Sequence, residues 1–149
     1  MRSVFFRLVL GGLAGTVALT LMMMFVAPMM GVHMDIAANI ASMLNAPWAI
    51  GMAIHLMMGV LIFPMVYGYL LQRHLPGSGP VRGMVWGGIL WLMLEMFVMP
   101  MMGKGFLGSN GPGMKGAVAA LLAHLIYGAL LGWTAALGQS ASMMEEMSI

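Results

Sequence analysis

Two histidines and a glutamate are the side chains of this sequence that could do chemistry within apolar segments. His55 is followed four residues later by Gly59, and His124 is followed at the same distance by Gly128. Residues four apart lie on one face of a helix, so each histidine is expected to share its helix face with a glycine. Because glycine has no side chain, a ligand or another helix could approach that face closely. Glu95 is the third ionisable group within a long apolar run. Imidazole and carboxylate are common metal ligands, which makes these three residues the candidate site.

The composition predicts that this site lies inside a membrane. The chain has 149 residues, of which 62% are hydrophobic and 7% charged, and its mean hydropathy is +0.98. A soluble domain carries about 25% charged residues. The absence of cysteine excludes disulfides, thiolate metal sites and a cysteine nucleophile. No stretch combines basic residues with stacking aromatic residues, so no nucleic-acid partner is expected.

Four segments are long and apolar enough, or nearly so, to form membrane-spanning helices, which need about 20 apolar residues each. They are residues 8–27, 48–71, 83–99 and 116–137. None shows the alternation with a period of two that a membrane β-strand requires. The sequence therefore predicts an all-α fold, a polytopic four-helix membrane bundle that forms one domain over residues 1–149.

The segments between the spans differ in character. Residues 35–45 place apolar and polar side chains on different faces of a helix, and Asp35 can cap its amino terminus, so a short helix is expected on the outer membrane surface. The connection 104–113 is rich in glycine and is expected to be irregular. The polar tail, residues 139–149, is expected to be frayed.

An internal repeat relates the two halves of the chain. A shift of 72 residues lays residues 25–31 on residues 97–103 with six of seven positions identical. The same shift pairs two Gly-x-x-x-Gly motifs, Gly11 with Gly15 and Gly83 with Gly87. This spacing lets helix backbones approach closely in lipid. Each half is therefore expected to be a helical hairpin whose first helix packs closely on a neighbour.

The histidines match at a shift of 69 residues, since 124 − 55 = 69. The repeats cover about residues 4–72 and 80–138. Two hairpins inserted in the same orientation form a parallel repeat about an axis along the membrane normal. His55 and His124 are therefore expected at similar depths on helices that run in the same direction.

The basic residues predict the orientation of the chain. Arg2, Arg7, Arg73 and Arg82 lie at one membrane side, whereas Lys104 and Lys115 lie at the other. The positive-inside rule then places both termini in the cytoplasm. We expect a multi-pass protein of the bacterial inner (cytoplasmic) membrane, surrounded by membrane lipid and associated with other membrane subunits or with further copies of itself.

Several motifs together resemble a family of small bacterial four-span membrane proteins of unknown function. They are Pro28-Met29-Met30-Gly31 with Met34-Asp35-Ile36-Ala37, His55-Leu56 with Gly59, Pro100-Met101-Met102-Gly103, and His124-Leu125 with Tyr127-Gly128. The resemblance covers nearly the whole chain. It implies the four-span topology and assigns no activity.

The leading functional interpretation is a non-catalytic membrane subunit, associated with a larger redox complex, in which the two histidines hold haem b or a transition metal. As axial haem ligands, His55 and His124 would need space for the macrocycle, which nearby glycines leave. The cofactor-binding candidates are His55, His124, Gly51, Gly59 and Gly128. For a metal ion the candidates are His55, His124 and Glu95.

Two alternatives remain open at the level of sequence. In a purely structural bundle without a cofactor, neutral histidines would bond to Glu95, Thr16, Thr20 or a backbone carbonyl. In a copper-handling membrane protein, the 22 methionines would supply thioether ligands for Cu(I). No serine or threonine has a histidine and a carboxylate at recognisable spacing and no phosphate-binding loop is present, so no enzymatic activity is expected.

Overall fold

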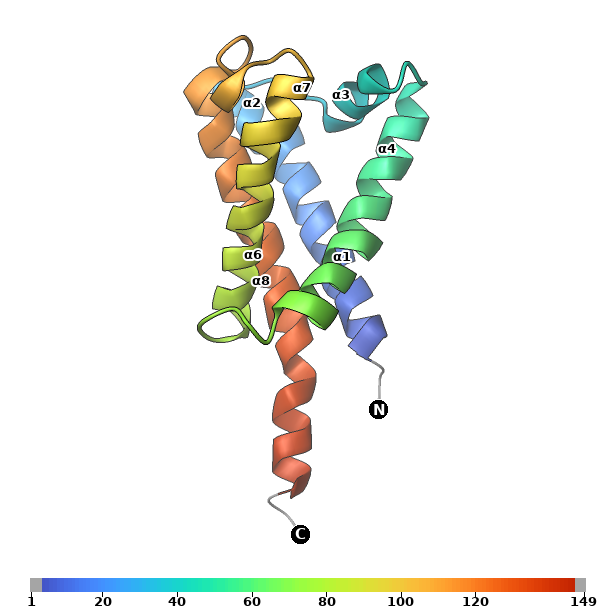
Figure 1. Ribbon diagram of the computed structural model, residues 1–149, viewed down its shortest axis with the longest axis vertical. Helices are drawn as coiled ribbons and strands as arrows, with labels where there is room; N and C mark the ends of the chain where they lie inside the picture. The colour runs from blue at the N-terminus through green and yellow to red at the C-terminus, as the bar shows by residue number, and fades with distance from the viewer. Residues whose placement is uncertain (1–3, 147–149) are drawn as a thin grey trace.

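The protein is a bundle of long apolar helices (Figure 1). The computed structural model describes residues 4–146, with side chains described for residues 4–137. Within these residues, four helices are long and apolar enough to cross a membrane. They are Val4–Met29, Trp48–Leu71, Gly79–Met101 and Gly113–Leu137. The predicted four-helix membrane bundle is confirmed, and three of the helices begin a few residues earlier than the apolar segments indicated.

Several of these spans are built from consecutive helical segments. The first contains α1 (Val4–Leu21), η1 (Met22–Val26) and α2 (Ala27–Met29). The second contains α4 (Trp48–Met57), η2 (Met58–Ile62), α5 (Phe63–Met65) and η3 (Val66–Leu71). The third contains α6 (Gly79–Met93), η4 (Leu94–Val98) and α7 (Met99–Met101), and the fourth is α8 (Gly113–Glu146). Two short helices, α3 (Ile36–Met43) and the 3₁₀ turn η5 (Phe106–Gly108), lie between spans.

Wide π-helical turns precede three prolines. The segments η1, η2 and η4 end two residues before Pro28, Pro64 and Pro100 respectively. A proline cannot donate a backbone hydrogen bond, and its ring clashes with the carbonyl four residues earlier, so the preceding turn widens. The first and third spans share this geometry at an offset of 72 residues, and Gly31 and Gly103 follow with φ of 77° and 71°.

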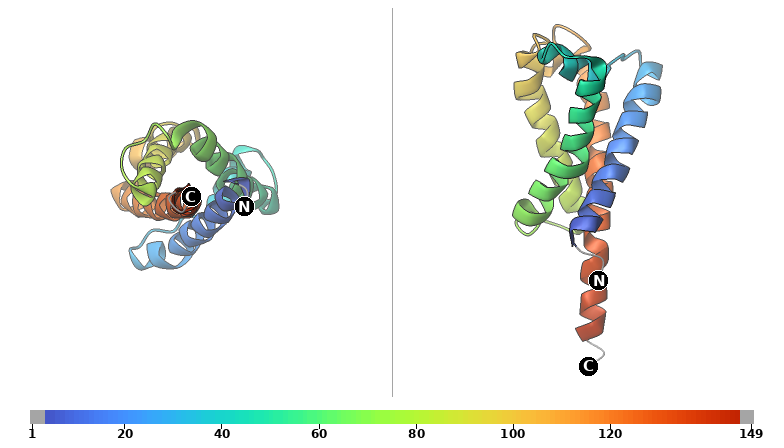
Figure 2. Two further views of the ribbon diagram at one scale, coloured as in Figure 1. Left: turned by 90° about the horizontal axis from the view of Figure 1, so that it is seen from below. Right: turned by 90° about the vertical axis from the view of Figure 1, so that its right-hand side faces the viewer.

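The second span packs on the first, the first on the fourth, and the fourth on the third. The start of α1 and the far end of α8 lie at one end of the bundle, called the terminal end here (Figure 1). The opposite end, called the distal end, carries α3 and η5 (Figure 1). The second span makes few contacts with the fourth (Figure 2). The second and fourth spans, which carry His55 and His124, therefore lack an extended common interface.

Glycines bring the third and fourth spans into backbone contact. A methyl group added at Gly83 would overlap the carbonyl of Gly128, and one added at Gly87 would overlap the carbonyl of His124. In the first span, Gly11 and Gly15 lie against α8 at Leu131 and Tyr127. Both Gly-x-x-x-Gly motifs therefore pack on the fourth span, which becomes the central helix of the bundle.

The connections agree with expectation at the distal end but not in the tail. Asp35 caps α3, because its side chain accepts a 2.8 Å hydrogen bond from the amide of Ala38. The expectation of a frayed tail over residues 139–149 was wrong for residues 139–146, since α8 continues to Glu146, and residues 147–149 lie outside the described residues. The tail contains alanine, glutamine, methionine and glutamate, which favour helices, and no proline interrupts it. Polarity alone does not end a helix.

Candidate functional site

A cavity of about 510 Å³ lies between the spans and brings the two predicted histidines together. His55 enters its wall from α4 and His124 from α8. The volume lies within the range of ligand pockets, about 300–1,000 Å³. The second and fourth spans are thus separated by a cavity to which both contribute a histidine.

Thioethers are the other potential ligands in the cavity wall. The methionines that line it are Met23, Met34, Met43, Met58, Met93, Met99 and Met102. The remaining lining is mostly aliphatic and aromatic, with Thr16, Asn39 and Tyr127 among the polar exceptions. No carboxylate and no lysine or arginine is found among the described residues that line it. Imidazole and thioether groups therefore predominate among the potential metal ligands of the lining, and they suit soft transition metals.

The imidazole of His124 has a defined tautomer. Its Nδ1 lies 2.7 Å from the backbone carbonyl of Ala120. A carbonyl oxygen accepts only, so Nδ1 carries the proton, and the neutral ring has its lone pair on Nε2. That nitrogen has no hydrogen-bond partner and is not among the fully covered polar atoms. Metal-binding histidines commonly donate their second N–H to a carbonyl in this way.

The hydrogen bonds of His55 indicate the opposite tautomer. Thr20 Oγ1 donates a 2.7 Å hydrogen bond to the carbonyl of Thr16. The single hydroxyl proton is thus engaged, and the 3.2 Å contact between Thr20 Oγ1 and His55 Nε2 is best made with Nε2–H as the donor. The lone pair of neutral His55 then lies on Nδ1. The partners found for the two histidines, Thr20 and a backbone carbonyl, are among those expected from the sequence.

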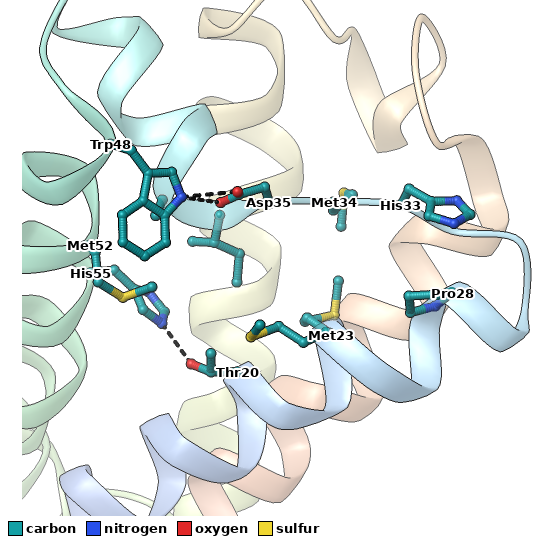
Figure 3. Close-up of a pocket in the computed structure, with 12 residues that line it drawn as sticks. Thr20, Met23, Pro28, His33, Met34, Asp35, Trp48, Met52 and His55 are labelled. Carbon is teal, nitrogen blue, oxygen red and sulfur yellow. Dashed lines mark hydrogen bonds between the residues drawn. The ribbon is translucent and has the colours of Figure 1, made fainter.

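A second pocket, of about 390 Å³, reaches His55 from the distal end (Figure 3). The linker before α3 forms one side of this pocket with His33, Met34 and Asp35. Asp35 accepts a 2.9 Å hydrogen bond from Nε1 of Trp48, which fastens the linker to α4 (Figure 3). His55 lines both this pocket and the central cavity. His55 therefore stands at the boundary between the two spaces.

The three candidate glycines have different surroundings. Gly51 packs on the backbone of Ala37 in α3, and Gly128 packs on Gly83 in α6. Neither of the two is among the residues that line the central cavity. Gly59 does line the cavity, and it also contacts the side chain of Thr16. The glycines therefore serve mainly to pack neighbouring helices, and Gly59 alone of the three borders the space near the histidines.

Glu95 does not join the two histidines. It is fully buried, neither carboxylate oxygen has a hydrogen-bond partner, and it is not among the cavity-lining residues. Trp91, one turn earlier, donates a 2.8 Å hydrogen bond to the carbonyl of Ala117, so this face of the third span is turned toward α8. Among the described residues, no three His, Asp or Glu side chains are close enough to hold a metal ion together. A metal at this site would depend on the two histidines and on methionine.

Tyr127 is a site residue for which the sequence motifs predict no role. It is 2% exposed, lines the cavity, and donates a 2.8 Å hydrogen bond to the carbonyl of Gly59. This bond ties the fourth span to the second within the cavity wall. The available signal in the sequence was a tyrosine three residues after His124, one residue before a glycine.

Fold and site together define a four-span helical membrane protein with a cavity between its spans, whose lining includes two histidines and seven methionines. The chain belongs to a family of unknown function, DUF6789, whose model matches residues 3–145. No curated protein and no solved structure matches the chain. The family membership expected from the sequence motifs is thereby confirmed, and it assigns no activity.

Proposed function

We propose that this protein is a non-catalytic membrane subunit that holds a metal centre in its central cavity, with His55 and His124 as protein ligands. The observation that carries the proposal is the tautomer of His124. Its Nδ1–H donates to the carbonyl of Ala120, so the lone pair of the neutral ring is on Nε2. His124 and His55 both line the central cavity. An ionisable side chain inside a membrane helix is costly, so a pair of them at one cavity calls for a functional reason.

The donor set favours a soft metal, and Cu(I) is the leading candidate. Seven of the cavity-lining residues are methionines, whose thioethers suit Cu(I), and imidazole binds it as well. The hydrogen bond to Thr20 leaves Nδ1 of His55 as the free nitrogen, and either imidazole nitrogen can bind a metal ion. The second pocket would give Cu(I) a path from the distal end to His55, because histidine and methionine side chains line it as well. Among them are His33, Met34 and Met52.

Haem b is the second candidate, favoured by the size and apolar character of the cavity. A volume of about 510 Å³ exceeds what a single ion needs. Histidine is a common axial ligand of haem iron, and the apolar wall would tune the reduction potential of the haem. Haem binding would require His55 to release Thr20 if it binds iron through Nε2. This added step ranks haem below Cu(I).

The test is the metal and pigment content of the purified protein. The wild type would be expressed with added copper or with a haem precursor, purified in mild detergent, and examined by metal analysis and absorption spectroscopy. We expect about one Cu(I) per chain in the wild type. Binding should weaken by about tenfold or more in His55→Ala and His124→Ala, since each loses a metal ligand.

His74→Ala is the matched control, because His74 is exposed at the terminal end and lies outside both cavities. It should bind copper as the wild type does. A Soret band that is absent in His124→Ala would instead establish haem. Protein that carries neither copper nor haem under both conditions, or that loses copper equally in His74→Ala, would overturn the proposal and leave a structural bundle.

The location and partners that we propose follow from the same features. The four apolar spans support a location in a membrane, for which we propose the bacterial inner membrane, and we propose that the protein is a subunit of a larger redox complex there. The excess of arginine at the terminal end supports a cytoplasmic location for both termini. A metal centre without a catalytic residue beside it suits electron transfer or metal delivery to a neighbouring subunit.

A further inference from the structure

The central cavity has an opening between the second and third spans. Side chains of α1 and α8 form one wall of the cavity, α3 covers its distal end, and the second and third spans form its two sides. These two spans meet edge to face at Phe63 and Trp86, with ring centroids 6.4 Å apart, and diverge from there toward the distal end (Figure 1). They share no extended packing contact in the part of the chain that the structure describes. The space between them therefore leads sideways out of the bundle.

Exposed methionines mark this lateral opening. Met93 of α6 and Met43 of α3 line the cavity and are 50% and 42% exposed. Met93 lies well inside the third span, so its exposed surface faces the hydrocarbon chains of the membrane. A ligand that enters here comes from the lipid phase. The described lining residues include no carboxylate, lysine or arginine, so the ligand that fits them is uncharged.

The two histidines offer hydrogen-bond acceptors to such a ligand. The lone pair of His124 lies on Nε2 and that of His55 on Nδ1, because the other ring nitrogens donate to Ala120 and Thr20. Neither acceptor has a hydrogen-bond partner, and neither is among the fully covered polar atoms. The two rings are also close enough to interact electrostatically. A head group with two hydroxyl donors would satisfy both nitrogens at once.

The remaining lining suits an aromatic ring with an apolar tail. Methionine sulfur makes favourable contacts with aromatic rings, and seven methionines line the cavity. The volume of about 510 Å³ is within the range of sites for ring-sized ligands. A ligand with a longer apolar chain would extend through the lateral opening into the lipid. A hydroquinone with an apolar side chain combines the two hydroxyl donors, the aromatic ring and the tail.

We propose that the central cavity binds a lipid-soluble hydroquinone, whose hydroxyl groups donate to His55 and His124 and whose tail leaves between the second and third spans. The proposal concerns reversible binding and includes no electron-transfer step. It rests on the proposed function only in assigning ligand binding to the same two imidazoles. A metal ion and the hydroquinone require the same lone pairs and would compete, so the test uses protein freed of metal by a chelator. Metal content and hydroquinone binding are then separate measurements, and either proposal can fail while the other stands.

Calorimetric titration of the metal-free protein in lipid nanodiscs tests the chemistry of the head group. The probes are a hydroquinone with a decyl chain, kept reduced without oxygen, the corresponding quinone, and the dimethyl ether of the hydroquinone. Empty nanodiscs give the baseline for partition into lipid. We expect the hydroquinone to bind at least about tenfold more tightly than the other two, because it alone donates to the imidazoles. Equal affinities for the three probes would overturn the proposal and would indicate an unspecific apolar groove.

Histidine variants locate the bound head group. His124→Ala and His55→Ala should each weaken hydroquinone binding by about fivefold to tenfold, since each loses one acceptor. His74→Ala should bind like the wild type, because His74 is exposed and lies outside both cavities. If the three variants bound the hydroquinone equally well, the assigned hydrogen bonds would be wrong. The comparison of the three probes on the wild type decides the matter if either cavity variant does not fold.

A tryptophan at the lateral opening tests the path of the tail. Met93→Trp should weaken hydroquinone binding by about tenfold, because a larger side chain obstructs the opening. Leu92→Trp is the matched control, since Leu92 is 47% exposed on the same helix and does not line the cavity. Equal binding by the two tryptophan variants would overturn the proposed path between the second and third spans.

Discussion

The hydroxyl of Tyr127 shows how one polar atom can position two spans that otherwise touch little. Its hydrogen bond to the carbonyl of Gly59 joins α8 to η2 in the wall of the cavity. Interhelical hydrogen bonds of this kind contribute about 0.6 to 1.5 kcal/mol. Tyr127→Phe should therefore lower the unfolding free energy by about 1 kcal/mol, measured by titration with a denaturing detergent in mixed micelles.

Tyr69→Phe is the control for this prediction, because Tyr69 is 53% exposed on the second span and no hydrogen bond is assigned to its hydroxyl. The same atom is removed there without loss of a structural contact, so stability should not change. Equal stability of the two variants would show that the Tyr127 hydroxyl does not hold the spans together.

At the scale of single residues, the sequence singles out two histidines that line one cavity, but it also groups Glu95 with them, and Glu95 does not line that cavity. His55 and His124 stand out because charged or polar groups are rare in apolar spans. Their hydrogen-bond partners, Thr20 and a backbone carbonyl, are two of the four that the structural alternative allowed. Glu95 was expected beside them on the basis of depth alone. It lies in the π-helical segment η4, where the wider turn changes which face each residue occupies. A period of 3.6 residues cannot anticipate that change.

Among the elements, the contact between α6 and α8 has the strictest steric requirement. Gly87 lies against the carbonyl of His124, so an added methyl group would force the two helices apart at the cavity. We expect Gly87→Ala to destabilise the protein by about 1–3 kcal/mol, the usual cost of overpacking. Thermal unfolding in detergent, followed by circular dichroism, would measure the loss.

Gly88→Ala is a close control, since the next residue of the same helix has no neighbouring atom within 4 Å of the added methyl group. Alanine favours a helix over glycine by about 1 kcal/mol, so this variant should be as stable as the wild type or more so. If Gly87→Ala were equally well tolerated, the close approach of α6 and α8 would not be a requirement of the fold.

The sequence predicts that glycines make close contacts, but it does not predict which helix each glycine meets. In the third span, Gly83 meets the backbone of Gly128 and Gly87 meets the carbonyl of His124. In the first span, Gly11 and Gly15 meet Leu131 and Tyr127, which also belong to the fourth span. A spacing of four residues between glycines shows only that they lie on the same face of their own helix. The partner depends on how all the spans pack at once, and single-sequence patterns do not contain that information.

For the whole molecule, hydropathy predicts the membrane-spanning helices well, because one physical requirement determines them. Backbone groups in lipid must be hydrogen-bonded within the segment, so a long apolar run becomes a helix. The central cavity was not predictable in the same way, because it arises where the second and fourth spans fail to pack. Methionines such as Met23 and Met58, which were spread along the sequence, face it together only in the folded bundle.

The orientation of the whole molecule can be tested with single cysteines, because the natural chain has none. Ser78 is exposed in the connection at the terminal end, and Ser109 is exposed in the connection at the distal end. Arginine is concentrated at the terminal end, so the positive-inside rule places Ser78 in the cytoplasm. A membrane-impermeant maleimide added to intact spheroplasts should label Ser109→Cys and should label Ser78→Cys only after permeabilisation. The reverse pattern would place the arginine-rich end outside, and labelling of both from outside would contradict the four-span topology.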